Sequence, residues 1–133
     1  MKGNKHFKVI FLLTIMACCL FSCNKSVNES AFISKLDVID VSMMAGQFDS
    51  SIKNLKKLEK NAFSTYQRLG IIKRYLKMGE KNLAENFIKK SLKTLPNDKE
   101  LLAVYSQILL RQNRFEEAEE YSKKLVGTSY ASI

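Results

Sequence analysis

From Ser30 onward, apolar residues recur three and four positions apart, without the alternation that a strand would show. This spacing puts side chains on one face of an α-helix, because the helix turns once in about 3.6 residues. Each of five such sets predicts one buried helix face. The sets are Phe48, Ile52, Leu55 and Leu58; Leu69, Ile72, Tyr75 and Leu76; Leu83, Phe87, Ile88, Ser91, Leu92 and Leu95; Leu101, Leu102, Tyr105, Ile108 and Leu109; and Phe115, Ala118, Tyr121 and Leu125. The chain is therefore predicted to be all-α, with about six helices.

The ends of these helices are predicted from glycine, proline and short polar residues. Gly46 and Gly79 fall where one helix should stop before the next begins, and glycine commonly follows a helix end. The segment 95–98, Leu-Pro-Asn-Asp, should end one helix and cap another. Asn97 followed by Glu100 resembles a capping box.

The last two helix pairs align with each other after a constant shift along the chain. The shift pairs Ala84 with Ala118, Glu85 with Glu119, Phe87 with Tyr121, and Lys89-Lys90 with Lys123-Lys124. It matches the period of tetratricopeptide repeats, which is about 34 residues. Small residues such as Ala84 and Ala118 allow paired helices to cross closely.

The chain resembles the tetratricopeptide repeat family at several positions of that motif. The middle unit carries Ile71, Tyr75, Ala84, Ile88 and Pro96 at motif positions, and the next carries Leu102, Tyr105, Leu109 and Ala118. Arg68 and Ile72 depart from the tryptophan and glycine of the motif, and Ser122 replaces an aromatic residue. The resemblance implies antiparallel helix hairpins stacked in an α-solenoid of about three repeats. The alternative is an ordinary helical bundle with accidental spacing.

The repeats are predicted at residues 30–62, 63–96 and 97–127, the first of them degenerate. Residues 128–133 are predicted to form a C-terminal tail with no obvious capping helix. Exposed apolar surface at that end would favour self-association or docking onto a larger assembly.

The N-terminal segment has the pattern of an export signal. Lys2, Lys5 and Lys8 precede an apolar run over 9–21, which is shorter than the roughly 20 residues of a membrane-spanning helix. Leu20-Phe21-Ser22-Cys23 resembles the lipobox of bacterial lipoproteins. The resemblance implies a signal peptide over 1–22, acyl chains on Cys23, and a lipidated tether over 23–29. The protein would then lie in the bacterial cell envelope, anchored to the inner or outer membrane.

Two other interpretations of the cysteines remain open. Ile15-Met16-Ala17-Cys18 is an alternative lipobox, which would move the lipid to Cys18. Cys18, Cys19 and Cys23 are otherwise apolar members of the segment, or form a disulfide or metal pair.

Residues for catalysis are scarce beyond the predicted leader. The single histidine is His6, and no histidine follows Cys23. Histidine-based acid–base catalysis, cysteine–histidine nucleophiles and histidine or cysteine metal sites are thereby excluded from the mature part. Glu116, Glu117, Glu119 and Glu120 are interpreted as a solvated helix face. We expect no enzymatic activity, no metal and no cofactor.

Charge offers a further indication of partners. Removing the three leader lysines from the net charge of +9 leaves +6, because every acid lies beyond Cys23. Lysines gather at Lys53, Lys56, Lys57 and Lys60, and at Lys89, Lys90 and Lys93. Such clusters contact anionic lipid head groups or an acidic partner, or are simply solvated helix faces. Nucleic acid is not expected as a partner of an exported protein.

The repeat resemblance implies that the first helix of each pair lines a concave groove. The residues predicted to face a partner there are Lys73, Lys77, Gln107 and Arg111, with Tyr66 nearby. A peptide or partner helix would lie along this groove. The leading prediction is a protein–protein interaction adaptor of the envelope. The alternative is a component that binds a small or hydrophobic solute between its helices.

Overall fold

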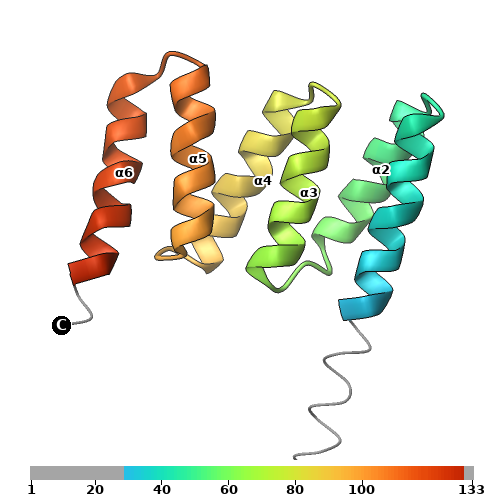
Figure 1. The fold of residues 1–133 in the computed structure, drawn as a ribbon, viewed down its shortest axis with the longest axis horizontal. Helices are drawn as coiled ribbons and strands as arrows, with labels where there is room; N and C mark the ends of the chain where they lie inside the picture. The colour runs from blue at the N-terminus through green and yellow to red at the C-terminus, as the bar shows by residue number, and fades with distance from the viewer. Residues whose placement is uncertain (1–28, 131–133) are drawn as a thin grey trace, which may run out of the picture. The chain divides into compact units, whose positions relative to one another are not determined.

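A computed structural model describes residues 29–130, and these residues form α-helices without any strand (Figure 1). The prediction of an all-α fold is confirmed for this part of the chain. The predicted signal peptide and Cys23, like residues 131–133, lie outside the described residues. Within residues 29–130, no helix has the length and hydropathy needed to cross a membrane.

Contacts divide the chain into two units, Met1–Lys35 and Leu36–Ile133. The described part of the first unit, residues 29–35, is helical, and Ser34 donates a hydrogen bond of 3.0 Å to the carbonyl of Ser30. The helix that begins there ends at residue 44 in the second unit. The other helices are α2 (Phe48–Glu59), α3 (Thr65–Lys77), α4 (Lys81–Thr94), α5 (Lys99–Arg111) and α6 (Phe115–Tyr130).

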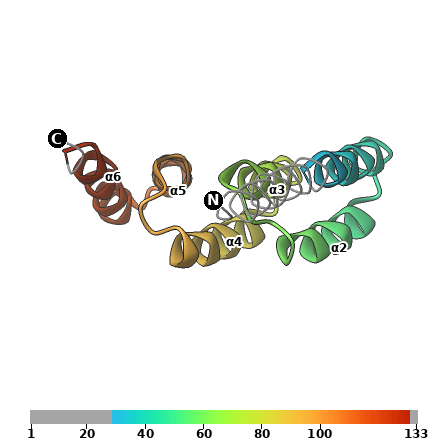
Figure 2. The same ribbon diagram turned by 90° about the horizontal axis from the view of Figure 1, so that it is seen from below.

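In the second unit, each of the helices α2 to α6 packs against the next along the chain, and α3 also contacts α5. Short turns join them, so consecutive helices run in opposite directions (Figure 1). Figure 2 shows α3 and α5 in one layer and α2 and α4 in a second layer. This arrangement brings the C-terminal half of α5 beside the end of α3 and the start of α4.

The positions of several helix ends follow from local chemistry. Gly46 and Gly79 both adopt positive φ, +73° and +82°, a conformation that glycine reaches without steric cost. The helix ends predicted at Gly46 and Gly79 are therefore confirmed. Ser64 caps α3 in a capping box with Gln67, which stabilises backbone N–H groups that would otherwise have no partner in the first turn.

The predicted cap of α5 is wrong by one residue. The N-cap is Asp98, not Asn97, and Asp98 Oδ1 accepts a hydrogen bond of 3.0 Å from the backbone N–H of Leu101. Asp98 has the extended backbone of an N-cap residue, whereas Asn97 lies in the turn after Pro96. The other oxygen, Oδ2, accepts from the Thr65 hydroxyl in the first turn of α3.

Most residues of the five predicted apolar faces are buried or partly buried, and two are exposed. Leu55, Ile72, Ile88 and Leu109 are among the fully buried members. Phe48 and Phe115 were expected on buried faces but are 50% and 58% exposed. Each is the first residue of its helix, where side chains tilt back toward the preceding turn and away from the core.

Small buried residues mark the places where helices approach closely. Ser51, Ala84 and Ala118 have essentially no exposed surface. Ser106 on α5 donates a hydrogen bond of 3.1 Å to the carbonyl of Ala118 on α6. A hydroxyl can reach the backbone of the partner helix only because alanine leaves room there, so the predicted role of small residues in packing agrees with their burial.

Candidate functional site

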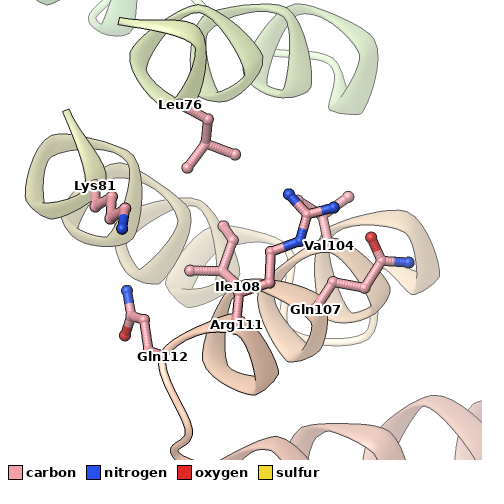
Figure 3. Close-up of a pocket in the computed structure, with 7 residues that line it drawn as sticks. All are labelled: Leu76, Lys81, Val104, Gln107, Ile108, Arg111 and Gln112. Carbon is pink, nitrogen blue, oxygen red and sulfur yellow. The ribbon is translucent and has the colours of Figure 1, made fainter. Parts of the chain in front are cut away.

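A pocket with a volume of about 170 Å³ lies where α5 meets the end of α3 and the start of α4; we call it the α5 pocket. Its lining residues are Leu76, Lys81, Val104, Gln107, Ile108, Arg111 and Gln112. Figure 3 shows Leu76 pointing from α3 toward α5, with the polar ends of Lys81 and Gln112 beside the gap.

One face of α5 supplies four of the seven residues that line the α5 pocket. Val104, Gln107, Ile108 and Arg111 are spaced three and four residues apart, so they share that face. Val104 and Ile108 provide apolar surface, and Gln107 and Arg111 are exposed at its rim. One helix thus supplies both an apolar floor and polar groups.

The two charged side chains that line the α5 pocket are both positive. Lys81 and Arg111 are cations, Gln107 and Gln112 are amides, and no acid lines the pocket. Amides both donate and accept hydrogen bonds, whereas the two cations only donate. The pocket can therefore hold an apolar group with carboxylates or carbonyl oxygens beside it. Residues 29–130 hold no group of three or more histidine, cysteine, aspartate or glutamate side chains suited to a metal ion.

The structure brings together two of the four residues predicted to contact a partner. Gln107 and Arg111 line the α5 pocket, whereas Lys73 and Lys77 are exposed on α3 and do not. Tyr66, 61% exposed in the first turn of α3, is also not part of it. Lys73 and Lys77 align with Gln107 and Arg111 under the same shift that pairs Ala84 with Ala118, so they hold the same positions along α3 that Gln107 and Arg111 hold along α5.

Five lining residues were not predicted as site residues. Leu76 and Ile108 were assigned to the core, and Val104 shares the face of α5 that carries Gln107 and Ile108. The spacing along α5 was therefore a usable signal for Val104 and Ile108. Lys81 and Gln112 lie at helix ends, and their places depend on the turns and on packing between helices.

A charged network adjoins the α5 pocket through Gln112. Gln112 Oε1 accepts a hydrogen bond of 2.8 Å from Arg114, which also donates to Glu85 on α4 at 2.7 Å. Glu85 Oε1 additionally accepts from Lys89 at 2.7 Å and from the hydroxyl of buried Tyr105 at 3.3 Å. The network therefore connects α4 to α5 and to the turn before α6.

The network stabilises the ionised form of Glu85. Burial is the largest single influence and raises the pKa of this carboxyl, but the hydrogen bonds from Lys89 and Arg114 together outweigh it. They lower the pKa of Glu85 from 4.5 to about 2. Desolvation raises the pKa of Tyr105, so its hydroxyl remains a hydrogen-bond donor.

The lowered pKa of Glu85 predicts a loss of stability in acid. The unfolded chain binds this proton near pH 4.5 and the folded chain only near pH 2, so protonation favours unfolding. The contribution, about 2 kcal/mol after allowance for screening by solvent, is complete above about pH 5 and declines as the pH falls toward 2. Urea unfolding at a series of pH values measures this contribution.

Two variants test the assignment to Glu85. Glu85→Gln should flatten the dependence of stability on pH between pH 5 and 2. Glu119→Gln, in an exposed pair with Lys123, should leave that dependence nearly unchanged, and equal profiles for the two variants would contradict the assignment.

The described residues define an all-α protein with a small, positively charged pocket between α3, α4 and α5. Comparison with known protein families finds no match for the chain. The chain is similar to an uncharacterized protein of Treponema pallidum (strain Nichols), with 26% identity over 102 residues. The match covers 77% of this chain but only 16% of that protein.

Proposed function

We propose that the helix pairs are tetratricopeptide-like repeats. The positions of the helix ends support this, because the N-caps Ser64 and Asp98 are separated by the same stretch of chain as the positive-φ residues Gly79 and Asn113. The starts of α3 and α5, Thr65 and Lys99, keep that separation too. This separation matches the tetratricopeptide period of about 34 residues. Helix caps, helix starts and helix ends that recur at one period are expected for repeats and not for an arbitrary bundle.

A third unit before them is supported by the buried small residues. Ser51, Ala84 and Ala118 recur at nearly the same period, near the starts of α2, α4 and α6. Gly46 precedes Gly79 by almost the same stretch of chain and has the same left-handed backbone. About three units then span residues 30–127, which is near the minimum for a stable stack.

The function that best fits this arrangement is that of a protein–protein interaction adaptor, without enzymatic activity. The observation that carries the proposal is the α5 pocket, whose volume of about 170 Å³ is smaller than the roughly 300–1,000 Å³ of typical small-molecule sites. It has room for one apolar side chain of a protein partner. Lys81 and Arg111 then select partners with acidic residues beside that side chain.

The proposal includes a lipid anchor at Cys23 that holds the repeats at a bacterial envelope membrane, either inner or outer. The lipobox-like sequence before Cys23 supports it, together with the polar tether over 24–29. Self-association is also part of the proposal, because Leu110, Phe115 and Val126 are each about half exposed toward the C-terminal end.

A photo-crosslinking amino acid at Gln107, in the full chain and in cells, tests the adaptor function. We expect a crosslinked protein product whose yield falls about tenfold when Arg111→Glu is added, because charge reversal replaces an attraction to acidic residues with repulsion. The mass of the product distinguishes a second copy of the chain from another protein.

Two controls make the result specific. The same crosslinker at Asn86, which is exposed on α4 and does not line the α5 pocket, should give no such product. Lys123→Glu, a charge reversal on α6 away from the pocket, should leave the yield at Gln107 within about twofold. Equal products from both crosslinker positions, or none from Gln107, would rule out the α5 pocket as the contact.

A further inference from the structure

A second, larger pocket lies between α4, the turn after it, α5 and α6. Its volume is about 500 Å³, and it shares no residue with the α5 pocket. We call it the lysine pocket. Its lining residues are Lys89, Leu92, Lys93, Pro96, Asn97, Leu102, Tyr121 and Lys124.

Three ammonium groups and no acid line the lysine pocket. Lys89 and Lys124 each form an ion pair of 2.7 Å with a glutamate on their own helix, Glu85 and Glu120. A lysine has three N–H donors, so each retains donors for a second anion. Lys93 has no ion pair with any other residue in the described part of the chain.

The remaining surface of the lysine pocket is largely apolar. Leu102, which is 1% exposed, lines it together with Leu92 and Pro96. The ring of Tyr121 meets the ring of Tyr105 edge-on, with 4.5 Å between centroids, and the ammonium of Lys124 lies 4.7 Å from the Tyr121 centroid. These contacts hold Tyr121 in place as a wall of the pocket.

We propose that the lysine pocket binds an organic phosphate monoester, with its phosphate among the three lysines and its apolar group on Leu102 and Tyr121. A phosphate monoester carries close to two negative charges at neutral pH, so it attracts the unpaired Lys93 and the remaining donors of Lys89 and Lys124 more strongly than a single carboxylate does. Lysine is a compact point charge that binds phosphate. The volume of about 500 Å³ lies within the range of small-molecule sites. This site is independent of the adaptor proposed for the α5 pocket.

Titration of the full chain with phenyl phosphate, followed by NMR, tests the proposal. We expect saturable shifts at Leu92, Leu102 and Tyr121. Inorganic phosphate lacks the apolar group and phenol lacks the charge, so each should bind at least about tenfold more weakly. If inorganic phosphate or phenol binds as tightly as phenyl phosphate, or if phenyl phosphate does not bind, the proposal is wrong.

Matched variants separate this pocket from the general positive charge of the chain. Lys93→Gln with Lys124→Gln should raise the Kd for phenyl phosphate by about tenfold or more, because each change removes a charge-assisted hydrogen bond. Lys90→Gln with Lys123→Gln removes equal charge from the same two helices, and Lys123 pairs with Glu119 as Lys124 does with Glu120. This control should change the Kd by less than about twofold, and equal weakening by both pairs would overturn the site.

Phosphate monoesters occur both as lipid head groups and as soluble compounds, and vesicles distinguish these sources. The chain without residues 1–22 and with Cys23→Ala, which carries neither the apolar run over 9–21 nor an acyl chain, would be sedimented with phosphatidylcholine vesicles that contain or lack phosphatidic acid. Sedimentation that needs both phosphatidic acid and the lysine pair Lys93 and Lys124 supports a lipid head group as the ligand. Binding of phenyl phosphate without such sedimentation supports a soluble phosphate ester.

Discussion

Replacing Tyr105 with alanine is expected to lower the free energy of unfolding by about 3–5 kcal/mol, the range for truncating a large buried aromatic side chain. Tyr105 has no exposed surface, and its ring packs edge-on against Tyr121. Its hydroxyl also donates to Glu85. The variant therefore leaves a cavity between α5 and α6 and takes one donor from the charged network. Urea unfolding followed by circular dichroism measures the loss.

One further variant separates the ring from the hydroxyl, and a second is a control at an exposed position. Tyr105→Phe keeps the ring and should cost only about 1 kcal/mol, the usual value of one hydrogen bond. Tyr66→Ala makes the same truncation at a side chain that is 61% exposed, so it should change stability by less than about 0.5 kcal/mol. Similar losses for Tyr66→Ala and Tyr105→Ala would contradict the burial of Tyr105.

Replacing Cys23 with alanine is expected to abolish lipid attachment and to leave residues 1–22 on the chain. The thiol of Cys23 is the proposed acylation site, and attached acyl chains contribute about 0.8 kcal/mol per buried methylene. The variant should therefore lack the lipid-sized increment in mass, while its retained apolar run over 9–21 still holds it at the membrane. Intact-mass analysis of both fractions shows whether the wild-type chain gains a lipid-sized increment and loses residues 1–22.

Cys18→Ala is the matched control, because Ile15-Met16-Ala17-Cys18 is the alternative lipobox. It should leave the lipid increment and the membrane association unchanged. If Cys18→Ala removes the lipid and Cys23→Ala does not, the anchor lies at Cys18. An unmodified wild-type chain that retains Met1 to Ser22 would refute the lipoprotein proposal.

Much of the fold was predictable because helical periodicity is a local signal. The faces that contain Leu55, Ile72 and Ile88 follow from spacing alone, and Gly46 and Gly79 mark real helix ends. The capping box of Ser64 and Gln67 was missed, although serine followed three residues later by glutamine is its usual pattern. The sequence did not distinguish Asn97 from Asp98 as the N-cap of α5, because both residue types are good N-caps. Only the backbone conformation identifies Asp98.

The candidate sites were less predictable because they form between helices. Gln107 and Arg111 were correctly placed on one face of α5, but the α5 pocket also requires Leu76 from α3 and Lys81 from α4. Lys89 and Lys93 belong to a lysine cluster that the sequence shows, whereas Lys124 lines the same pocket only because α6 packs against α5. Periodicity indicates which face of a helix a side chain occupies, but not which helix lies opposite.

The two oxygens of Asp98 give α5 an unusual dependence on α3. One oxygen holds the first turn of α5 through Leu101, and the other holds the hydroxyl of Thr65 at the first turn of α3. Unwinding the start of α5 therefore also breaks a hydrogen bond to the first turn of α3. The shared carboxylate therefore couples fraying at the two helix starts, and amide hydrogens in the first turns of α3 and α5 should exchange with solvent together.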